Sequence, residues 1–269
     1  MMNKKIGFIG SGHIAGILAH NFIKRLGIPS QNICVSDPDR SKSEALASRF
    51  GVCALDSNVD IVKQADYIFI CVHPVAVTNI IGDVRSQNLT GKTLISVTAG
   101  TPTRLYRKAL GDCFVTRILP NPPSSLGEGA IPIVIDERMP EPEKTDVLQL
   151  ISSLGKSFPV SEEKIDIFTS VTSPAPVLSF FEAMIEAAVY CGLDHSTASS
   201  MVKQTIKGCL ALCETGDREI SSLIIEACTP GGTSVESLRT MDKGAFRSTV
   251  KEAYIDAYEK SRSLGKDKS

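Results

Sequence analysis

The feature of this chain that most constrains its fold is a glycine-rich turn close to its start. The apolar run I-G-F-I leads directly into G-S-G-H-I-A, which places Gly10, Gly12 and Ala15 in a G-x-G-x-x-A arrangement. A strand is predicted before the turn, over residues 5–10, and a helix after it, over residues 15–26. In that context the first glycine permits the tight turn, the second lets the backbone approach a pyrophosphate, and the small alanine allows close packing of helix on sheet. The segment therefore predicts a dinucleotide-binding fold rather than a simple tight turn.

The remainder of the first half alternates short β-branched runs with helical stretches. Further strands are predicted over residues 33–36, 67–72, 93–97, 114–118 and 130–135, and helices over residues 42–50, 59–64, 104–109 and 143–154. Several of the strands are apolar on both faces, as a parallel sheet covered by helices on both sides requires. We therefore expect an α/β domain of the Rossmann type.

The pattern changes in the second half, where long helical periodicity takes over from about residue 166. Residues 176–191, 196–214 and 246–260 each hold apolar positions at three- and four-residue spacing. We expect a dinucleotide-binding domain over residues 1–160, followed by an all-α domain over residues 161–269.

Composition excludes several classes of function. The chain has 29 basic and 30 acidic side chains, so no positive field is present to neutralise nucleic acid or an anionic membrane surface. No apolar stretch approaches the roughly 20 residues that span a bilayer, and the start does not read as a targeting segment, so we expect a cytoplasmic protein. Eight cysteines include no C-x-x-C pair, and Cys209 and Cys213 have no second pair nearby, so we expect no metal site.

The residues around the end of the second predicted strand give opposite indications for NAD and NADP. Asp37 ends that strand, and an acid there usually binds the ribose 2′-hydroxyl of NAD and repels a 2′-phosphate. Ser36, Arg40, Ser41 and Lys42 lie close by, and such residues hold a 2′-phosphate instead. The sequence favours NADH slightly over NADPH and leaves both open. His73, at the end of the run Y-I-F-I-C-V-H-P, is expected to line the ligand crevice without transferring a proton.

Five segments in order carry a resemblance to a known family. They are G-F-I-G-S-G-H-I-A, C-V-H-P, S-V-T-A-G, R-I-L-P-N-P-P and T-P-G-G-T-S, the last covering residues 229–234. In this order and spacing they resemble Δ1-pyrroline-5-carboxylate reductase, over almost the whole chain. The resemblance implies a two-domain enzyme that reduces a cyclic imine to L-proline, the last step of proline synthesis. It also implies C-terminal helices that interlock between two subunits, giving homodimers or larger homo-oligomers built from dimers.

The resemblance also implies site residues. The cofactor is expected to contact the glycine turn, the strand ends and the loops that follow them: Ile9, Gly10, Ser11, Gly12, His13, Ile14, Ser36, Asn58, Val72, His73, Pro74, Thr98, Ala99 and Gly100. Asp37, Arg40 and Asn121 complete the expected cofactor site. The substrate is expected to contact Ser170, Ser173, Asp217, Gly231, Gly232, Thr233 and Ser234.

The chemistry of the glycine loop at residues 229–234 can be argued from its residues. It leads into a helical run over residues 235–241, so its N–H groups lie at a helix start, where they bind a carboxylate. Ser234 is expected to hydrogen-bond the imine nitrogen, with Thr233 alongside. Because a cyclic imine is easily protonated in water, positioning against the nicotinamide requires no strong acid. The alternative is a plain loop whose Ser or Thr caps a helix.

Some segments depart from the family pattern. The family has Lys-Pro where this chain has His73-Pro74, and Asn-Thr-Pro where it has Asn-Pro-Pro at residues 121–123. The family's S-G-S-G-P-A-Y reads S-V-T-S-P-A-P at residues 170–176, and its H-P-G-x-L-K-D stretch is replaced at residues 219–225. Two alternatives therefore stay open: a reductase of the same fold acting on another imine or a β-hydroxy acid, and a catalytically degraded dinucleotide-binding relative. A hydroxy-acid enzyme needs a lysine or histidine acid in the first long helix of the second domain, and residues 176–191 contain neither.

Overall fold

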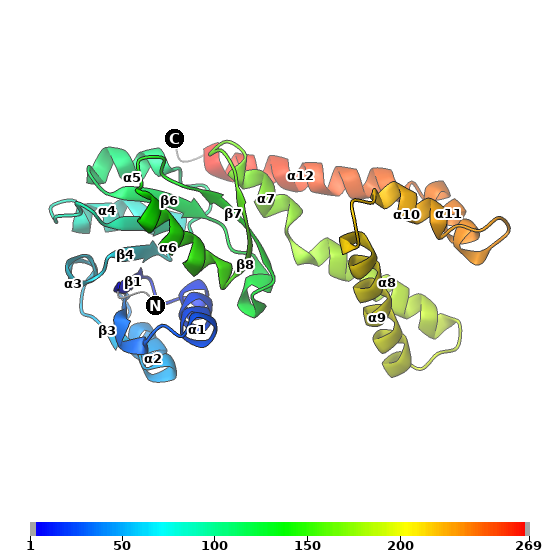
Figure 1. The fold of residues 1–269 in the computed structure, drawn as a ribbon, viewed down its shortest axis with the longest axis horizontal. Helices are drawn as coiled ribbons and strands as arrows, with labels where there is room; N and C mark the ends of the chain where they lie inside the picture. The colour runs from blue at the N-terminus through cyan, green and yellow to red at the C-terminus, as the bar shows by residue number, and fades with distance from the viewer. Residues whose placement is uncertain (1–3, 267–269) are drawn as a thin grey trace. The chain divides into compact units, whose positions relative to one another are not determined.

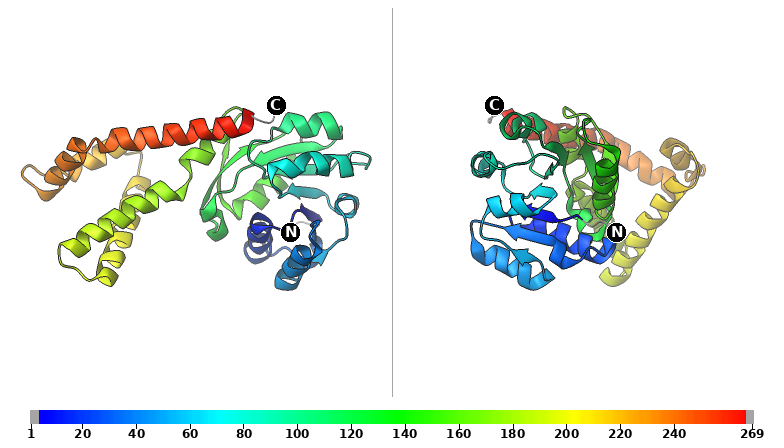
Figure 2. Two further views of the ribbon diagram at one scale, coloured as in Figure 1. Left: turned by 180° about the vertical axis from the view of Figure 1, so that it is seen from behind. Right: turned by 60° about the vertical axis from the view of Figure 1, so that its left-hand side comes forward.

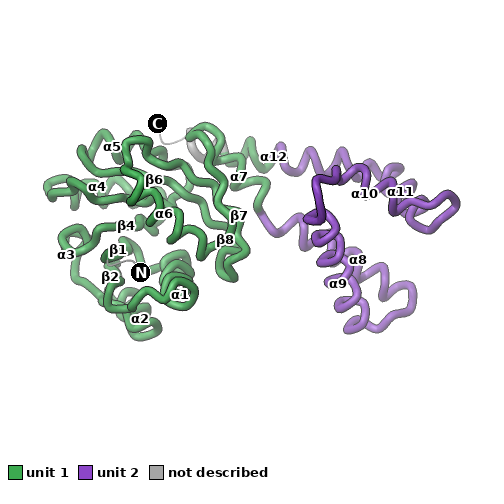
Figure 3. The backbone as a smooth tube through the Cα atoms, in the orientation of Figure 1, with its two compact units in different colours: residues 1–172, 257–269 green, residues 173–256 purple. Residues whose placement is uncertain are grey.

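The structure is a computed structural model that describes residues 4–266 (Figure 1). Within this range the chain forms two compact units (Figure 3). The first holds the residues up to 172 and those from 257 onward, and the second holds residues 173–256. The first unit continues beyond the expected boundary at residue 160, because helix α7 (Ile165–Val171) packs on strand β7 (Gly129–Val134).

The first unit is built on an eight-stranded sheet with the strand order β3-β2-β1-β4-β5-β6-β7-β8. All neighbouring strands are parallel except β6 and β7. The remaining strands are β1 (Ile6–Ile9), β2 (Ile33–Ser36), β3 (Cys53–Ala54), β4 (Tyr67–Ile70), β5 (Thr93–Ser96), β6 (Phe114–Ile118) and β8 (Gly155–Pro159). The crossover order on both sides of β1 confirms the predicted α/β fold of the Rossmann type.

Helices cover both faces of this sheet (Figures 1 and 2). Apolar residues of one core cluster come from α1 (His13–Leu26), α2 (Arg40–Phe50) and α6 (Glu141–Ser152). A second cluster takes its residues from α3 (Asn58–Gln64), α4 (Val77–Val84) and α5 (Thr103–Leu110). Successive strand side chains alternate between the two, so Phe8 of β1 belongs to the first cluster and Ile9 to the second. Burial on both faces explains the continuous apolar strands of the sequence.

A buried arginine ties the sheet to the start of α7. The side chain of Arg117 in β6 is only 2% exposed and donates to Glu162 and to Asp166, at 2.8 Å in each case. Glu162 also accepts the backbone N–H and the hydroxyl of Thr103, at 3.2 and 2.6 Å. Because a buried charge is tolerated only when it is paired, these carboxylates fix the position of the segment between β8 and α7.

The second unit is entirely helical. It contains α8 (Pro174–Tyr190), α9 (His195–Glu214), α10 (Ile220–Glu226), α11 (Thr233–Lys243) and the first part of α12 (Phe246–Lys266). Among the described residues of this unit only Ala198 and Val202 are buried, while large apolar side chains such as Leu178 and Ile225 are exposed. Helices this apolar need a further surface to cover them. No helix in residues 4–266 combines the length and apolar character needed to cross a membrane.

Candidate functional site

The glycine turn between β1 and α1 is held by close backbone packing. Gly10 has a positive φ of 99°, and a Cβ at this position would lie 2.5 Å from the carbonyl oxygen of Cys71. Its N–H donates to the carbonyl of Ser36, at 2.8 Å. Only glycine fits both the backbone angle and the close approach, so the first glycine of the motif has the role that the sequence predicts.

The N-terminus of α1 is open to a ligand. Gly12 is its N-cap, no side chain caps it, and no acidic residue lies in its first turn. A Cβ built on Gly12 meets no atom within 4 Å, so the space beside the turn is empty of protein. Uncapped N–H groups next to open space, at the positive end of a helix dipole, fit the diphosphate of a dinucleotide.

Asp37 is engaged with the backbone around it. One of its carboxylate oxygens accepts the N–H of Ser11, at 2.8 Å, and the other accepts the N–H of Asp39, at 3.0 Å. Ser11 is 8% exposed, and its hydroxyl has no hydrogen-bond partner among the described residues. Arg40 is exposed and pairs with Glu44, at 2.8 Å, and with Asp56, at 2.5 Å.

Ser36 and Asn58 lie together at the end of β2. The Ser36 hydroxyl donates to the Asn58 side-chain oxygen, at 2.8 Å, and the Asn58 amide donates to Asp83 of α4, at 2.9 Å. Ser36 is buried. The two predicted cofactor residues thus form one network, whose orientation is set by an acid that sequence reasoning missed. A lone aspartate in α4 gave no signal for this role.

The loops after β4 and β5 are also joined. The Thr98 hydroxyl lies 3.3 Å from the carbonyl of Val72 and 3.4 Å from that of Ile70. His73 and Ala99 are exposed at the same edge of the sheet, where β1, β4 and β5 end in parallel. Removal from water raises the pKa of the Cys71 thiol, which keeps it neutral beneath the glycine turn. This edge is where ligands bind in open α/β sheets.

Asn121 has a structural role in this unit. It caps the short 3-10 helix η3 (Pro122–Leu126) in a capping box, in which its side chain and that of Ser124 satisfy each other's backbone. Its side-chain amide also donates to the carbonyl of Thr172, at 3.1 Å, at the end of α7. The spacing of an Asn and a Ser three residues apart is a readable capping signal.

In the second unit, the expected substrate loop forms a second open helix N-terminus. Gly231 has a positive φ of 73°, and the N–H of Gly232 donates to the carbonyl of Thr229, at 2.9 Å. Gly232 is the N-cap of α11, which no side chain caps, and Thr233 and Ser234 are exposed in its first turn. The plain-loop alternative expects the hydroxyl of a Ser or Thr to cap the helix, and no such bond forms here.

The remaining expected substrate residues, Ser170, Ser173 and Asp217, belong to three different segments of the chain. Ser170 belongs to the first unit, is 5% exposed, and donates its hydroxyl to the carbonyl of Ile167, at 2.7 Å. Ser173 is the N-cap of α8, and Asp217 is exposed between α9 and α10. No cluster of three or more His, Cys, Asp or Glu side chains suited to a metal ion occurs in the described part of the chain.

Two family models match this chain. One, described as pyrroline-5-carboxylate reductase dimerisation, matches residues 162–264. The other, described as NADP oxidoreductase coenzyme F420-dependent, matches residues 5–100. The first match falls in the helical part of the chain and the second in the α/β part.

Relatives and solved structures match the chain over nearly its whole length. The pyrroline-5-carboxylate reductase of Escherichia coli strain K12 is 30% identical and aligns with 98% of this chain and 100% of its own. The corresponding enzyme of Arabidopsis thaliana is 27% identical and aligns with 97% of this chain and 95% of its own. The crystal structure of Plasmodium falciparum pyrroline carboxylate reductase with NADP bound has a TM-score of 0.86 at 26% identity, covering 98% of this chain and 99% of that one.

Proposed function

The chain belongs to the pyrroline-5-carboxylate reductase family, and on that premise we propose that it reduces 1-pyrroline-5-carboxylate to L-proline with hydride from NADPH or NADH. The proposal is carried by two uncapped helix N-termini that follow glycine turns, the start of α1 in the first unit and the start of α11 in the second. Each follows a glycine with positive φ, and neither is capped by a side chain. One suits the diphosphate of a dinucleotide and the other suits the carboxylate of a small acid.

The first unit holds the expected cofactor residues. When bound, the reduced nicotinamide supplies the hydride, and the turn at residues 9–14 would hold the diphosphate. The loops at residues 72–74 and 98–100, which Thr98 joins, would form the wall of the nicotinamide crevice. The similarity to a structure with NADP bound favours NADPH over the slight preference for NADH that Asp37 suggested by sequence.

The second unit holds most of the expected substrate residues. The N–H groups at the start of α11 would bind the carboxylate of pyrroline-5-carboxylate, and the Ser234 hydroxyl would accept a hydrogen bond from the protonated ring nitrogen. Gly231 and Gly232 carry no side chain of their own, and the hydroxyl of Thr229 lies beside Gly232, 2.5 Å from where a Cβ would be. The chain's own contribution is therefore to position the imine carbon and stabilise its charged groups, and proton transfer from a strong acid is not needed.

We also propose that the enzyme acts as a homodimer, or as a larger oligomer built from dimers. The dimerisation model covers residues 162–264, and the helices in this range leave their large apolar side chains exposed in the single chain. A second copy would cover them.

All eight cysteines are free thiols, which fits the reducing conditions of the cytoplasm.

The test is turnover by the purified chain. We expect oxidation of reduced cofactor, followed by the loss of absorbance of the reduced nicotinamide, to require pyrroline-5-carboxylate and to yield proline. Cofactor binding without turnover would reject the activity in favour of a degraded relative. Turnover with other cyclic imines alone would reject the substrate, and would direct attention to the altered segment at residues 170–176.

A further inference from the structure

The loop between β5 and α5, residues 97–102, carries three of the expected cofactor residues, at positions 98–100. Its first part is fixed by the Thr98 hydroxyl, which lies 3.3 Å from the carbonyl oxygen of Val72. A displacement of about 1 Å in a group that positions a reactant can cost a large factor in rate. The way in which the other end of this loop is fixed therefore bears on the reaction.

Helix α5 begins without a cap from its own neighbourhood. Pro102 is its N-cap residue, and no side-chain hydrogen bond is made from that position. Instead Glu162, which is 59 positions further along the chain, accepts the backbone N–H of Thr103 at 3.2 Å and its hydroxyl at 2.6 Å. A carboxylate at this end of a helix pairs an N–H that has no partner within the helix, and the helix dipole favours its charge. Glu162 thus supplies the cap of α5 from a distant segment.

Arg117 of β6 holds Glu162 in this place. Its side chain is 2% exposed, and its two terminal nitrogens donate to Glu162 and to Asp166, at 2.8 Å in each case. The remaining guanidinium nitrogen, Nε, has no hydrogen-bond partner among the described residues. One carboxylate oxygen of Glu162 accepts from Arg117 and the other accepts from Thr103. Glu162 therefore bridges a buried cation in β6 and the first residue of α5, and both of its oxygens are engaged.

We propose that Glu162 is a positioning residue for the nicotinamide: by capping α5 it fixes the second end of the loop at residues 97–102, as Thr98 fixes the first. This inference rests on the proposed function, which places the nicotinamide beside residues 98–100. Glu162 acts through the loop rather than on the ligand. Its loss should loosen the wall of the nicotinamide crevice and leave the remainder of the cofactor site in place.

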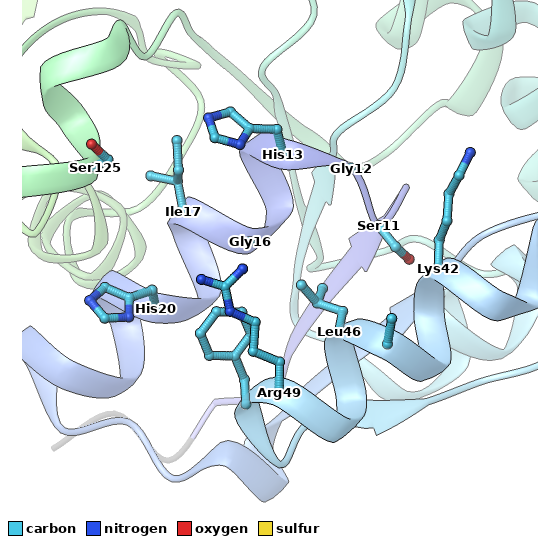
Figure 4. A pocket seen from close by; sticks show the side chains of 12 residues that line it. Ser11, Gly12, His13, Gly16, Ile17, His20, Lys42, Leu46, Arg49 and Ser125 are labelled. Carbon is cyan, nitrogen blue, oxygen red and sulfur yellow. The ribbon is translucent and has the colours of Figure 1, made fainter.

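The groove that opens beside the glycine turn has a different lining (Figure 4). Its volume is about 530 Å³, and its described lining residues come from the turn, from α1 and α2, and from Ser125 of η3. Neither Glu162 nor any residue of the loop at 97–102 is among them. A change at Glu162 should therefore affect the nicotinamide end of the cofactor and spare the end that contacts the glycine turn.

The experiment compares NADPH with 2′-phospho-ADP-ribose, which is the same molecule without its nicotinamide ring. Dissociation constants are measured with the full-length chain and without substrate, by fluorescence titration for NADPH and by displacement of NADPH for the fragment. Glu162→Gln keeps the size of the side chain but removes its charge and one of its two acceptor oxygens. It should raise the constant for NADPH about fivefold and leave that for the fragment within about twofold. An unchanged constant for NADPH, or an equal rise for both ligands, would overturn the assignment.

Thr103 offers a second and milder test of the same bridge. Thr103→Val removes the hydroxyl while keeping the shape of the side chain, and should raise the NADPH constant about threefold. Thr103→Ser keeps the hydroxyl and should bind NADPH as the parent chain does. Thr103→Val that binds NADPH as tightly as the parent, or Thr103→Ser that binds as weakly as Thr103→Val, would contradict a role for the bond to Glu162.

Asp136→Asn is the matched control for a general loss of stability. Asp136 is another buried carboxylate, and it lies 3.4 Å from the guanidinium of Arg107 in the last turn of α5, at the opposite end of the helix from Thr103. Its replacement should leave the NADPH constant within about twofold. A rise equal to that of Glu162→Gln would show that weakening any anchor of α5 has the same effect, and would overturn the specific role of Glu162.

Kinetics separate this inference from the proposed reaction. With pyrroline-5-carboxylate, Glu162→Gln should lower kcat about threefold to tenfold and leave KM for the imine within about twofold, because the expected substrate residues at the start of α11 are unaltered. A raised KM with an unchanged kcat would contradict the positioning role. A parent chain that does not turn over the imine would refute the proposed function, and the comparison of NADPH with its fragment would still decide the role of Glu162.

Discussion

The backbone N–H of Ser11 donates to the carboxylate of Asp37, at 2.8 Å, and so ties the glycine turn to the end of β2. The two residues are 26 positions apart in the chain, and β1 and β2 are neighbours in the sheet. With Gly10 donating to the carbonyl of Ser36 nearby, the two strand ends form one rigid edge. The acid after β2 therefore shapes the turn that we propose holds the diphosphate.

Replacing Asp37 by alanine should weaken NADPH and NADH together. Loss of the carboxylate leaves the Ser11 N–H without its acceptor and loosens the turn that both cofactors use. A hydrogen bond to a charged group contributes about 1.5–3 kcal/mol, so we expect each dissociation constant to rise about tenfold or more. The measurement is titration of both cofactors. Asp37→Asn keeps one acceptor oxygen and should lie between the two. Tighter NADPH binding with weaker NADH binding would instead show that the carboxylate binds ribose and repels phosphate.

The two glycines of the turn should respond differently to a side chain. Gly10→Ala places a Cβ 2.5 Å from the Cys71 carbonyl oxygen at a φ of 99°, so the free energy of unfolding should fall by about 2 kcal/mol or more. Gly12 has an ordinary φ of −73° and open space around it, so Gly12→Val should fold, with a loss near 1 kcal/mol. The valine fills the space of the diphosphate, and cofactor binding should disappear. Urea unfolding and cofactor titration of both variants check this, and a Gly12→Val chain that binds NADPH normally would refute the placement of the diphosphate.

The glycine turn could be predicted from the sequence because its signal is local. A turn between a strand and a helix is encoded in a few adjacent residues, and the same is true of the long helices α8, α9 and α12, whose periodicity spans several turns. Some short elements escaped prediction, although α3 and α5, of similar length, were predicted. Those missed are α4, which has eight residues including Gly82, α7 and α10, with seven each, and β3, with two. Elements of this length depend on tertiary contacts for their stability.

The site was predicted less completely than the fold. Several residues at the strand ends were predicted to belong to the site, but their hydrogen-bond partners lie far along the chain and were not predicted. Asn58 bonds to Asp83, which is 25 positions away, and Asn121 bonds to the carbonyl of Thr172, which is 51 positions away. No periodicity or motif encodes such pairs, because the sheet topology brings them together.

The proposed hydrogen bond between Ser234 and the imine nitrogen can be tested by steady-state kinetics. Ser234→Ala should lower kcat/KM for pyrroline-5-carboxylate about tenfold to a hundredfold, since the variant loses a hydrogen bond to a charged ring nitrogen, while the dissociation constant for NADPH stays unchanged. Ser237→Ala is a matched control, because that hydroxyl lies one turn further along α11 and donates to the carbonyl of Thr233. Equal kcat/KM for Ser234→Ala and the parent enzyme would remove the residue from the mechanism.

Asp136 should make the stability of the first unit dependent on pH. Burial alone would raise its pKa, but hydrogen bonds from Arg138 and from the backbone N–H groups of Val115 and Arg138 outweigh burial and lower the pKa to about 2. A carboxyl whose pKa falls on folding stabilises the folded state above its unfolded pKa of 3.8, and that stabilisation disappears as the pH falls toward 2. The shift corresponds to about 2 kcal/mol at neutral pH.

Asp136→Asn isolates this contribution. The amide presents an NH2 group to N–H donors, so at pH 7 the free energy of unfolding should be lower than in the parent chain by about 2 kcal/mol. Below pH 4 the difference should shrink, because Asp136 of the unfolded parent chain takes up a proton while the folded carboxylate stays ionised until near pH 2, and asparagine titrates in neither state. Urea unfolding of both proteins at equal protomer concentration, in steps from pH 7 to pH 3, measures the difference directly. A difference that stays constant over this range would mean that Asp136 acts through packing and hydrogen-bond geometry rather than through its charge.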